Sequence, residues 1–288
     1  MNRRHFLHSL AASPLLMHPL SLQDVSAFTS QGDKMPVLFI GHGNPMYAIT
    51  DNPYRKVWQE LGKKLPQPKA VLCISAHWLT NNTSITMTEK PKTIHDFGGF
   101  PQELFDVKYP APGSPTFGRI TKNLIQSTQV QEDMEWGLDH GAWSVLRNMY
   151  PEANIPIFQM SRHFQKSAYY HYQLAKEIMK LRYQGVLILA SGNVVHNLGM
   201  MNWDEQAKPF DWAIEFDELV RDSIQNNNPT PLIEYEKMGN VAKLAHPTND
   251  HYLPLMYALG VRDQKDEVTF FNDTLDMGSL SMRSVLFS

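Results

Sequence analysis

Three histidines occupy equivalent places in the sequence, each a few residues after a short apolar run that is typical of a buried strand. They are His42, His77 and His196, which follow the runs 37–40, 70–75 and 185–190. Imidazole is the commonest protein metal ligand near neutral pH. Because ligands in open α/β sheets gather beyond the carboxyl ends of strands, the pattern predicts a metal site at the strand ends.

Further histidines occur beside residues that are common in active sites. His246 and His251 precede an apolar, helical stretch, while His95 and His140 each neighbour an aspartate and a glycine in predicted loops. Loops that present two titratable side chains on a rigid scaffold are common in active sites. The same Asp and Gly residues would also serve turn geometry alone, so function and turn chemistry both remain open for these two loops.

The composition restricts what else the chain could do. It has one cysteine, Cys73, so a multi-thiolate zinc site and an internal disulfide are excluded, and nitrogen and oxygen ligands must hold any metal. The formal net charge is -3, and no dense basic run is present to neutralise a phosphate backbone. The sequence contains no serine-elbow, Walker, His-Glu-x-x-His or dinucleotide-binding motif. Nucleic-acid binding and these catalytic classes are therefore not expected.

The elements that must position the histidines alternate along the chain. Between and after the three strand-like runs, helical periodicity covers 54–61, 117–127, 169–183 and 210–225. This alternation predicts an α/β domain with a central mixed or largely parallel sheet flanked by helices. With no repeat and no linker after residue 34, we expect one catalytic domain over 35–288.

The first 34 residues differ from the rest of the sequence. A paired-arginine head, Arg3-Arg4, precedes a short and mildly apolar stretch that is interrupted by prolines. This order is similar to a twin-arginine export signal and predicts a periplasmic protein; a disordered tail on a cytoplasmic protein is the alternative. The stretch is too short to cross a bilayer, and no other segment of the sequence reads as a membrane span.

Six ordered motifs together resemble the class III extradiol ring-cleavage dioxygenases, and the DOPA 4,5-dioxygenase subgroup in particular. The resemblance covers about 35–282, essentially the whole predicted domain. The motifs are Gly41-His42-Gly43-Asn44-Pro45-Met46, Ser75-Ala76-His77-Trp78, His95-Asp96-Phe97-Gly98-Gly99-Phe100-Pro101, Gly137-Leu138-Asp139-His140-Gly141, Ser191-Gly192-Asn193-Val194-Val195-His196-Asn197 and His246-Pro247-Thr248-x-x-His251.

The resemblance implies a small catechol bound to a non-haem metal and cleaved beside its two hydroxyls by O2 to give a semialdehyde. It assigns His42, His77 and His251 to the metal. His196 matches a residue that is either a further ligand or the base for the catechol proton, and His140 matches a second active-site histidine suited to acid–base work.

The resemblance also implies a substrate pocket and a cofactor. His95, Asp96 and Phe97 are expected to bind substrate. One divalent metal per chain is expected, Fe(II) for turnover, with Zn(II) as the alternative because His251 stands where better-studied relatives have glutamate. The alternatives on the same fold are a zinc-dependent hydrolase using His140 or His196 as base, and a non-enzymatic metal-binding protein. The oligomeric state is left open.

Overall fold

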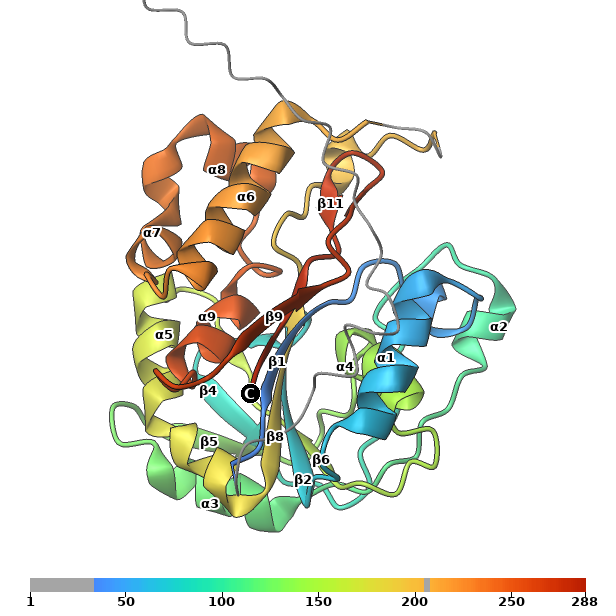
Figure 1. Cartoon of the computed structure of the whole chain (residues 1–288). Helices are drawn as coiled ribbons and strands as arrows, with labels where there is room; N and C mark the ends of the chain where they lie inside the picture. The colour runs from blue at the N-terminus through green and yellow to red at the C-terminus, as the bar shows by residue number, and fades with distance from the viewer. Residues whose placement is uncertain (1–33, 205–207) are drawn as a thin grey trace, which may run out of the picture.

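The computed structural model describes residues 34–204 and 208–288, which form an α/β domain around one six-stranded sheet (Figure 1). The strand order is β6-β2-β8-β1-β12-β9. β1, β2, β6 and β8 run parallel, whereas β12 runs antiparallel to both β1 and β9. The predicted fold class, a mixed and largely parallel sheet flanked by helices, is confirmed.

The elements of the main sheet are β1 (Val37–Gly41), β2 (Ala70–Ser75), β6 (Ile157–Gln159), β8 (Val186–Gly192), β9 (Val268–Phe271) and β12 (Ser284–Phe287). The α-helices are α1 (Pro53–Lys64), α2 (Gln102–Phe105), α3 (Pro115–Leu124), α4 (His140–Met149), α5 (Ala168–Glu177), α6 (Asp211–Gln225), α7 (Thr230–Ile233), α8 (Asn240–Ala245) and α9 (Leu253–Gly260). Three small two-stranded sheets pair β3 (Leu79–Thr80) with β7 (Arg162–His163), β4 (Thr83–Thr86) with β5 (Val130–Asp133), and β10 (Leu275–Asp276) with β11 (Leu280–Ser281). Short 3-10 helices are η2 (Pro45–Ala48), η3 (Met179–Gln184), η4 (Leu198–Met200) and η5 (Tyr235–Met238).

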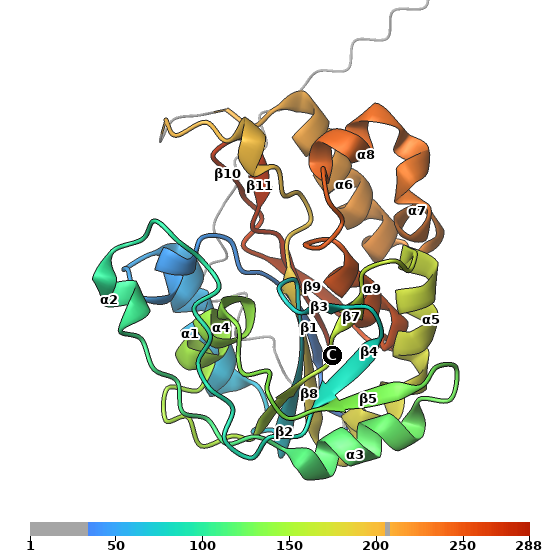
Figure 2. The same ribbon diagram turned by 180° about the vertical axis from the view of Figure 1, so that it is seen from behind.

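The central strands are apolar throughout because both faces of the sheet are covered. Alternate residues of β1 point to opposite sides: Leu38 and Ile40 pack with α1 and α4, whereas Val37 and Phe39 pack with α5 and α9. Figure 2 shows α1 and α4 on one side of the sheet and α5, α6 and α9 on the other. The two hydrophobic cores hold the parallel strands rigidly, so that their carboxyl ends can present side chains at one edge.

Most predicted elements are found within a few residues of their expected bounds. The helical pattern over 169–183 divides into α5 and η3. The start of α4 and three strands of the main sheet were missed. His140 lies in the first turn of α4 rather than in a loop, and the sheet has three further strands, the parallel β6 and the antiparallel β9 and β12. Residues 1–33, which carry nearly all of the predicted export signal, lie outside the described residues. Within 34–204 and 208–288, no helix is long and apolar enough to cross a membrane.

Two histidines in the core are expected to make the fold sensitive to acid. Burial lowers the pKa of His171 and of His246 to about 3. In the unfolded chain both titrate near 6.5, so the unfolded state binds more protons below that pH. Above pH 6.5 both rings are neutral in the folded and the unfolded chain, so the free energy of unfolding does not depend on them. It falls as the pH drops from 6.5 toward 3, because only the unfolded chain takes up the protons. Between pH 7.5 and 5 we expect each to remove about 2 kcal/mol from the free energy of unfolding.

Urea unfolding of the wild type and of His171→Gln at both pH values measures this effect. The variant should lose about 2 kcal/mol less than the wild type on acidification, because it lacks one of the two titrations. Equal losses in the two proteins would show that His171 does not bring this sensitivity.

Candidate active site

The carboxyl ends of the parallel strands bring the strand-end histidines together. β1 and β2 both flank β8, with Gly41 opposite Gly192 and Ser75 opposite Ser191. The backbone pairing continues past the strands, since the His42 amide donates to the Gly192 carbonyl at 3.1 Å. The chain therefore leaves β1 and β2 at the same level, and His42 and His77 meet at one edge of the sheet.

Glycines permit the close packing that this arrangement needs. A Cβ on Gly192 would lie 2.2 Å from the backbone oxygen of His251. A Cβ on Gly141 would lie 2.4 Å from the Ser75 Oγ and 2.9 Å from the His77 ring. All three distances are shorter than a van der Waals contact, so these positions admit only glycine unless the neighbouring groups move.

Replacement of Gly141 by alanine is accordingly expected to displace the His77 ring. We expect Gly141→Ala to weaken zinc binding measurably and to cost about 1–3 kcal/mol in stability, as overpacking typically does. Zinc titration and thermal unfolding measure the two effects. Gly98→Ala is the matched control, because a Cβ there would meet nothing within 4 Å. If Gly141→Ala matched Gly98→Ala in both measurements, the proposed steric role of Gly141 would be wrong.

Four imidazole rings cluster at this edge. The rings of His42 and His77 have centroids 5.1 Å apart, and His251 lies 5.2 Å and 5.0 Å from them. The His140 ring lies 3.9 Å from His77 and 5.5 Å from His42. Ligand nitrogens of His42, His77 and His140 all lie within 4.8 Å of one another. Residues from four separate parts of the chain thus surround one small volume.

The Nδ1 atom of each candidate ligand faces an oxygen that can accept a hydrogen bond from it. His42 Nδ1 lies 3.0 Å from the Ser191 Oγ, and because this hydroxyl donates to the Gly141 carbonyl it accepts from His42. His77 Nδ1 lies 3.2 Å from an Asp96 carboxylate oxygen, and His251 Nδ1 lies 2.5 Å from Asp250. A proton on Nδ1 leaves the Nε2 lone pair free, which is how proteins commonly orient metal-binding histidines.

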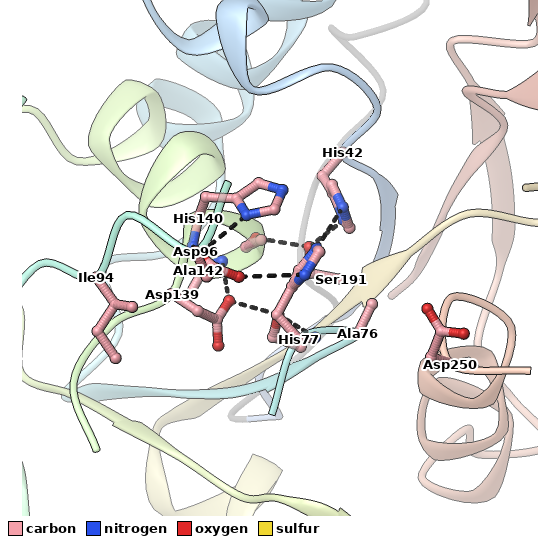
Figure 3. Close-up of polar contacts among 12 residues, drawn as sticks. His42, Ala76, His77, Ile94, Asp96, Asp139, His140, Ala142, Ser191 and Asp250 are labelled. Atoms are coloured by element: carbon pink, nitrogen blue, oxygen red, sulfur yellow. Dashed lines mark hydrogen bonds and ion pairs between the residues drawn. The ribbon is translucent and has the colours of Figure 1, made fainter. Parts of the chain in front are cut away.

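His140 reaches the cluster from the first turn of α4. Asp139 caps this helix by accepting from the Ala142 amide, and it also accepts from the Ser75 hydroxyl at 2.5 Å. Asp96 lies 3.0 Å from His140 Nδ1 and accepts the His140 backbone amide at 2.9 Å. Figure 3 shows Asp96 beside His140, with Asp250 on the far side of His77. His140 is therefore tied to the same carboxylate that faces His77.

His196 occupies the opposite side of the cluster, stacked on His251. The two rings are nearly parallel, with centroids 3.5 Å apart and an interplanar angle of 4°. The loop after β8 is held there because the His196 amide donates to the Ala245 carbonyl and the residue forms a bridge with Leu280. The structure thus brings together all five histidines that the sequence assigned to metal or to acid–base roles.

Burial keeps the candidate ligands neutral. It lowers the pKa of His42, His77 and His251 well below 6.5, and neighbouring histidines lower each pKa further. The pKa of His196 falls to about 4, mainly through burial, although the Asp250 charge opposes this shift. For Asp96, burial alone would raise the pKa, but hydrogen bonds and charge from His140 outweigh it and the pKa is lowered. Neutral imidazoles beside an ionised carboxylate are the protonation states that favour a bound cation.

The donor set fits a divalent metal. The Nε2 atoms of His42 and His77 face each other at 3.1 Å, and two lone pairs at that distance need a proton or a cation between them. Burial makes the proton unfavourable, so a metal satisfies both nitrogens better. Imidazole nitrogen is a good ligand for both Fe(II) and Zn(II), so the ligands do not select one of them.

The aromatic loop predicted to bind substrate lies partly at the cluster. The Phe97 ring packs edge-on against His140, with centroids 5.5 Å apart. The ring of His95 instead contacts Phe97, Phe105 and Trp143, and its Nε2 lies 3.0 Å from the Val107 carbonyl oxygen. Trp78 is buried and stacked on Trp136. Phe97 and Asp96 therefore lie beside the histidines of the cluster, whereas His95 is held away from them by its own contacts.

Sequence reasoning missed some of the residues that support the histidines. Arg162 is fully buried and donates through Nε to the Ser75 carbonyl and through Nη2 to the Ala76 carbonyl, directly before His77. Burial lowers the pKa of Arg162 to about 10. Ser191 lies within a motif noted in the sequence, yet nothing there indicated that its hydroxyl holds His42. Two supporting carboxylates did give a sequence signal: Asp250 as the residue next to His251, and Asp96 as a predicted substrate-binding residue.

Comparison with known proteins agrees with this geometry. The family described as the catalytic LigB subunit of aromatic ring-opening dioxygenase matches residues 36–280. The chain belongs to the LigB family. This membership confirms the resemblance to class III extradiol enzymes and identifies the protein as a ring-opening dioxygenase, so the hydrolase and the non-enzymatic alternatives are set aside.

Relatives of this LigB-family chain are similar over most of their length. A protein of Escherichia coli K12 named 4,5-DOPA dioxygenase extradiol is 45% identical over 257 residues, which cover 88% of this chain and 94% of that protein. A protein of the same name from Beta vulgaris is 35% identical over 266 residues, covering 90% and 98%. The crystal structure of an uncharacterized E. coli K12 protein superposes with a TM-score of 0.78 at 39% identity, covering 88% of this chain and all of that one.

Proposed function

We propose that this enzyme cleaves the ring of a small, DOPA-like catechol with O2 and gives a semialdehyde. The observation that carries the proposal is the buried cluster of neutral histidines, whose Nδ1 atoms face oxygens, in a chain of the LigB family. The 45% identical relative named 4,5-DOPA dioxygenase extradiol supports the substrate class.

We propose that His42, His77 and His251 hold one divalent metal, Fe(II) during turnover, with His196 as a further ligand or as the base. The support is that each of the first three has an oxygen partner at Nδ1, and that their ring centroids lie 5.0 to 5.2 Å apart. Fe(II) held there would supply a redox-active centre for the reaction of the catechol with O2, whereas Zn(II) would have no accessible redox change.

The acid–base work falls to His140 and His196. Both flank the three proposed ligands, His140 next to His77 and His196 against His251. Because the pKa of His196 is lowered to about 4, this imidazole is neutral at pH 7 and is able to accept a catechol proton. We propose that His140 holds or returns a proton at its Nε2 on the opposite side, while Phe97 excludes water and packs against the aromatic ring.

The substrate class is tested with the Fe(II)-loaded enzyme and two matched amino acids. DOPA carries two adjacent hydroxyls and tyrosine carries one, so only DOPA can bind through two oxygens. We expect O2 uptake and a yellow ring-opened product with DOPA and neither with tyrosine. Turnover of simpler catechols but not of DOPA would show that the substrate is not DOPA-like. Turnover of tyrosine would contradict the catechol mechanism.

We propose further that residues 1–34 direct twin-arginine export to the periplasm. The support is the Arg3-Arg4 pair ahead of a mildly apolar stretch. Fractionation of a bacterial host that expresses the full chain and an Arg3→Lys, Arg4→Lys variant tests this. The wild type should reach the periplasm and the variant should not; retention of both in the cytoplasm would contradict export.

A further inference from the structure

One carboxylate, that of Asp96, contacts two histidines of the cluster with its two oxygens. Its Oδ2 lies 3.2 Å from His77 Nδ1, and its Oδ1 lies 3.0 Å from His140 Nδ1. The side chain is 20% exposed, so it lies at the rim of the cluster rather than inside it. Sequence reasoning had placed Asp96 among the substrate-binding residues, but its observed contacts are with the two imidazoles (Figure 3).

The two residues that precede Asp96 are fixed by contacts with other parts of the chain. Before it, the Ile94 amide donates to the Leu138 carbonyl at 2.7 Å, and the Ile94 carbonyl accepts from the Trp143 indole at 2.8 Å. The neighbouring His95 ring is held at the Val107 carbonyl. Trp143 belongs to α4, the helix that begins at His140. The loop is thus fastened to the element that carries one of the two histidines.

The first turn of α4 fixes the carboxylate itself. The His140 amide, one of the N-terminal amides that has no partner within the helix, donates to Asp96 Oδ1 at 2.9 Å. The positive end of the helix favours a negative charge at that place. Asp96 Oδ1 therefore cannot leave His140 without losing a charge-assisted hydrogen bond, and Oδ2 remains directed at His77.

We propose that Asp96 is a positioning residue that holds His77 and His140 in one fixed relation, so that both Nε2 atoms face the space between the rings. This rests on the proposed function both for the role of His140 and for the metal contact of His77, but zinc affinity tests the second without any ring cleavage. A carboxylate accepts at both oxygens, whereas an amide accepts at one oxygen only. Asp96→Asn therefore keeps the shape and loses support for at least one ring.

The experiment measures zinc affinity and, with saturating Fe(II), kcat for DOPA in four proteins: wild type, Asp96→Asn, His140→Ala and the double variant. We expect Asp96→Asn to weaken zinc binding roughly 10- to 100-fold, as loss of a histidine's outer partner commonly does, in both backgrounds. We expect kcat to fall at least about 10-fold in the wild-type background, with little change in KM. In the His140→Ala background it should fall no further, because the effect on kcat passes through His140.

The matched control is Asp106→Asn, the same chemical change ten residues later. Asp106 is exposed, and its carboxylate accepts from Gln102. This variant should behave as the wild type in all measurements, and thermal unfolding should show that Asp96→Asn remains folded.

Two results would overturn the proposal. Unchanged zinc affinity in Asp96→Asn would show that the carboxylate does not hold His77, and this measurement is independent of any ring cleavage. An equal fall in kcat in both backgrounds would show that Asp96 does not act through His140. Absence of turnover in the wild type would count against the proposed function, while the zinc affinities would still decide the contact with His77.

Discussion

Replacement of His42 or His77 by alanine is expected to abolish stoichiometric metal binding and all turnover with catechols. The two Nε2 atoms are 3.1 Å apart at the carboxyl ends of β1 and β2, the two parallel strands that flank β8, so we expect a metal at this edge to contact both. Loss of one imidazole leaves the other buried and without its shared cation. Zinc titration of the metal-free protein and elemental analysis after dialysis measure the effect.

His163→Ala is the control for the two ligand variants. His163 is a half-buried histidine in β7 whose Nδ1 accepts from the Gln165 amide, outside the cluster. This variant should bind one equivalent of metal with the affinity of the wild type. Retention of one tightly bound metal in His42→Ala or His77→Ala would contradict the assignment of the metal site to the strand ends.

His140→Ala is expected to separate metal binding from catalysis. We expect this variant to keep one equivalent of metal, because His42, His77 and His251 remain, and to lose about 100-fold or more in kcat, the range typical of acid–base residues. Metal content and steady-state kinetics with DOPA measure the two effects on the same preparation.

Two other outcomes are informative. His140 lies closer to His77 than His251 does, so a variant that has lost its metal would make His140 a ligand instead of an acid–base residue. Full metal content together with an unchanged kcat would remove His140 from the mechanism altogether. The comparison therefore decides between the two roles that the ring positions allow.

The fold and the candidate site were predictable from the sequence to different degrees. The parallel strands β1, β2 and β8 could be predicted because a strand buried on both faces is a continuous apolar run. Once those strands were placed, His42 and His77 followed, since the carboxyl ends of parallel strands meet at one edge. The β9 strand was missed because its residues are mostly half-buried, which gives a weak pattern, and α4 because its start is set by a capping aspartate within a glycine-containing segment.

Contacts between distant segments could not be predicted from local patterns. Asp96 and His140 are 44 residues apart, and Ser191 and His42 are 149 residues apart. Each pair forms only because loops bring distant segments back to the same edge of the sheet. The spacing of residues within one segment does not predict this. The resemblance of motifs identified the histidines, but only the folded chain shows which oxygen faces each Nδ1.

Metal-dependent oxygen consumption tests the central claim most directly. The metal-free enzyme is reloaded without air with either Fe(II) or Zn(II), DOPA is added, and O2 uptake is recorded together with the yellow absorbance of the ring-opened product. The account predicts that the Fe(II) form consumes one O2 for each DOPA cleaved and turns yellow, while the Zn(II) form does neither. Equal O2 uptake by the two forms, or none by the Fe(II) form with any catechol, would contradict it.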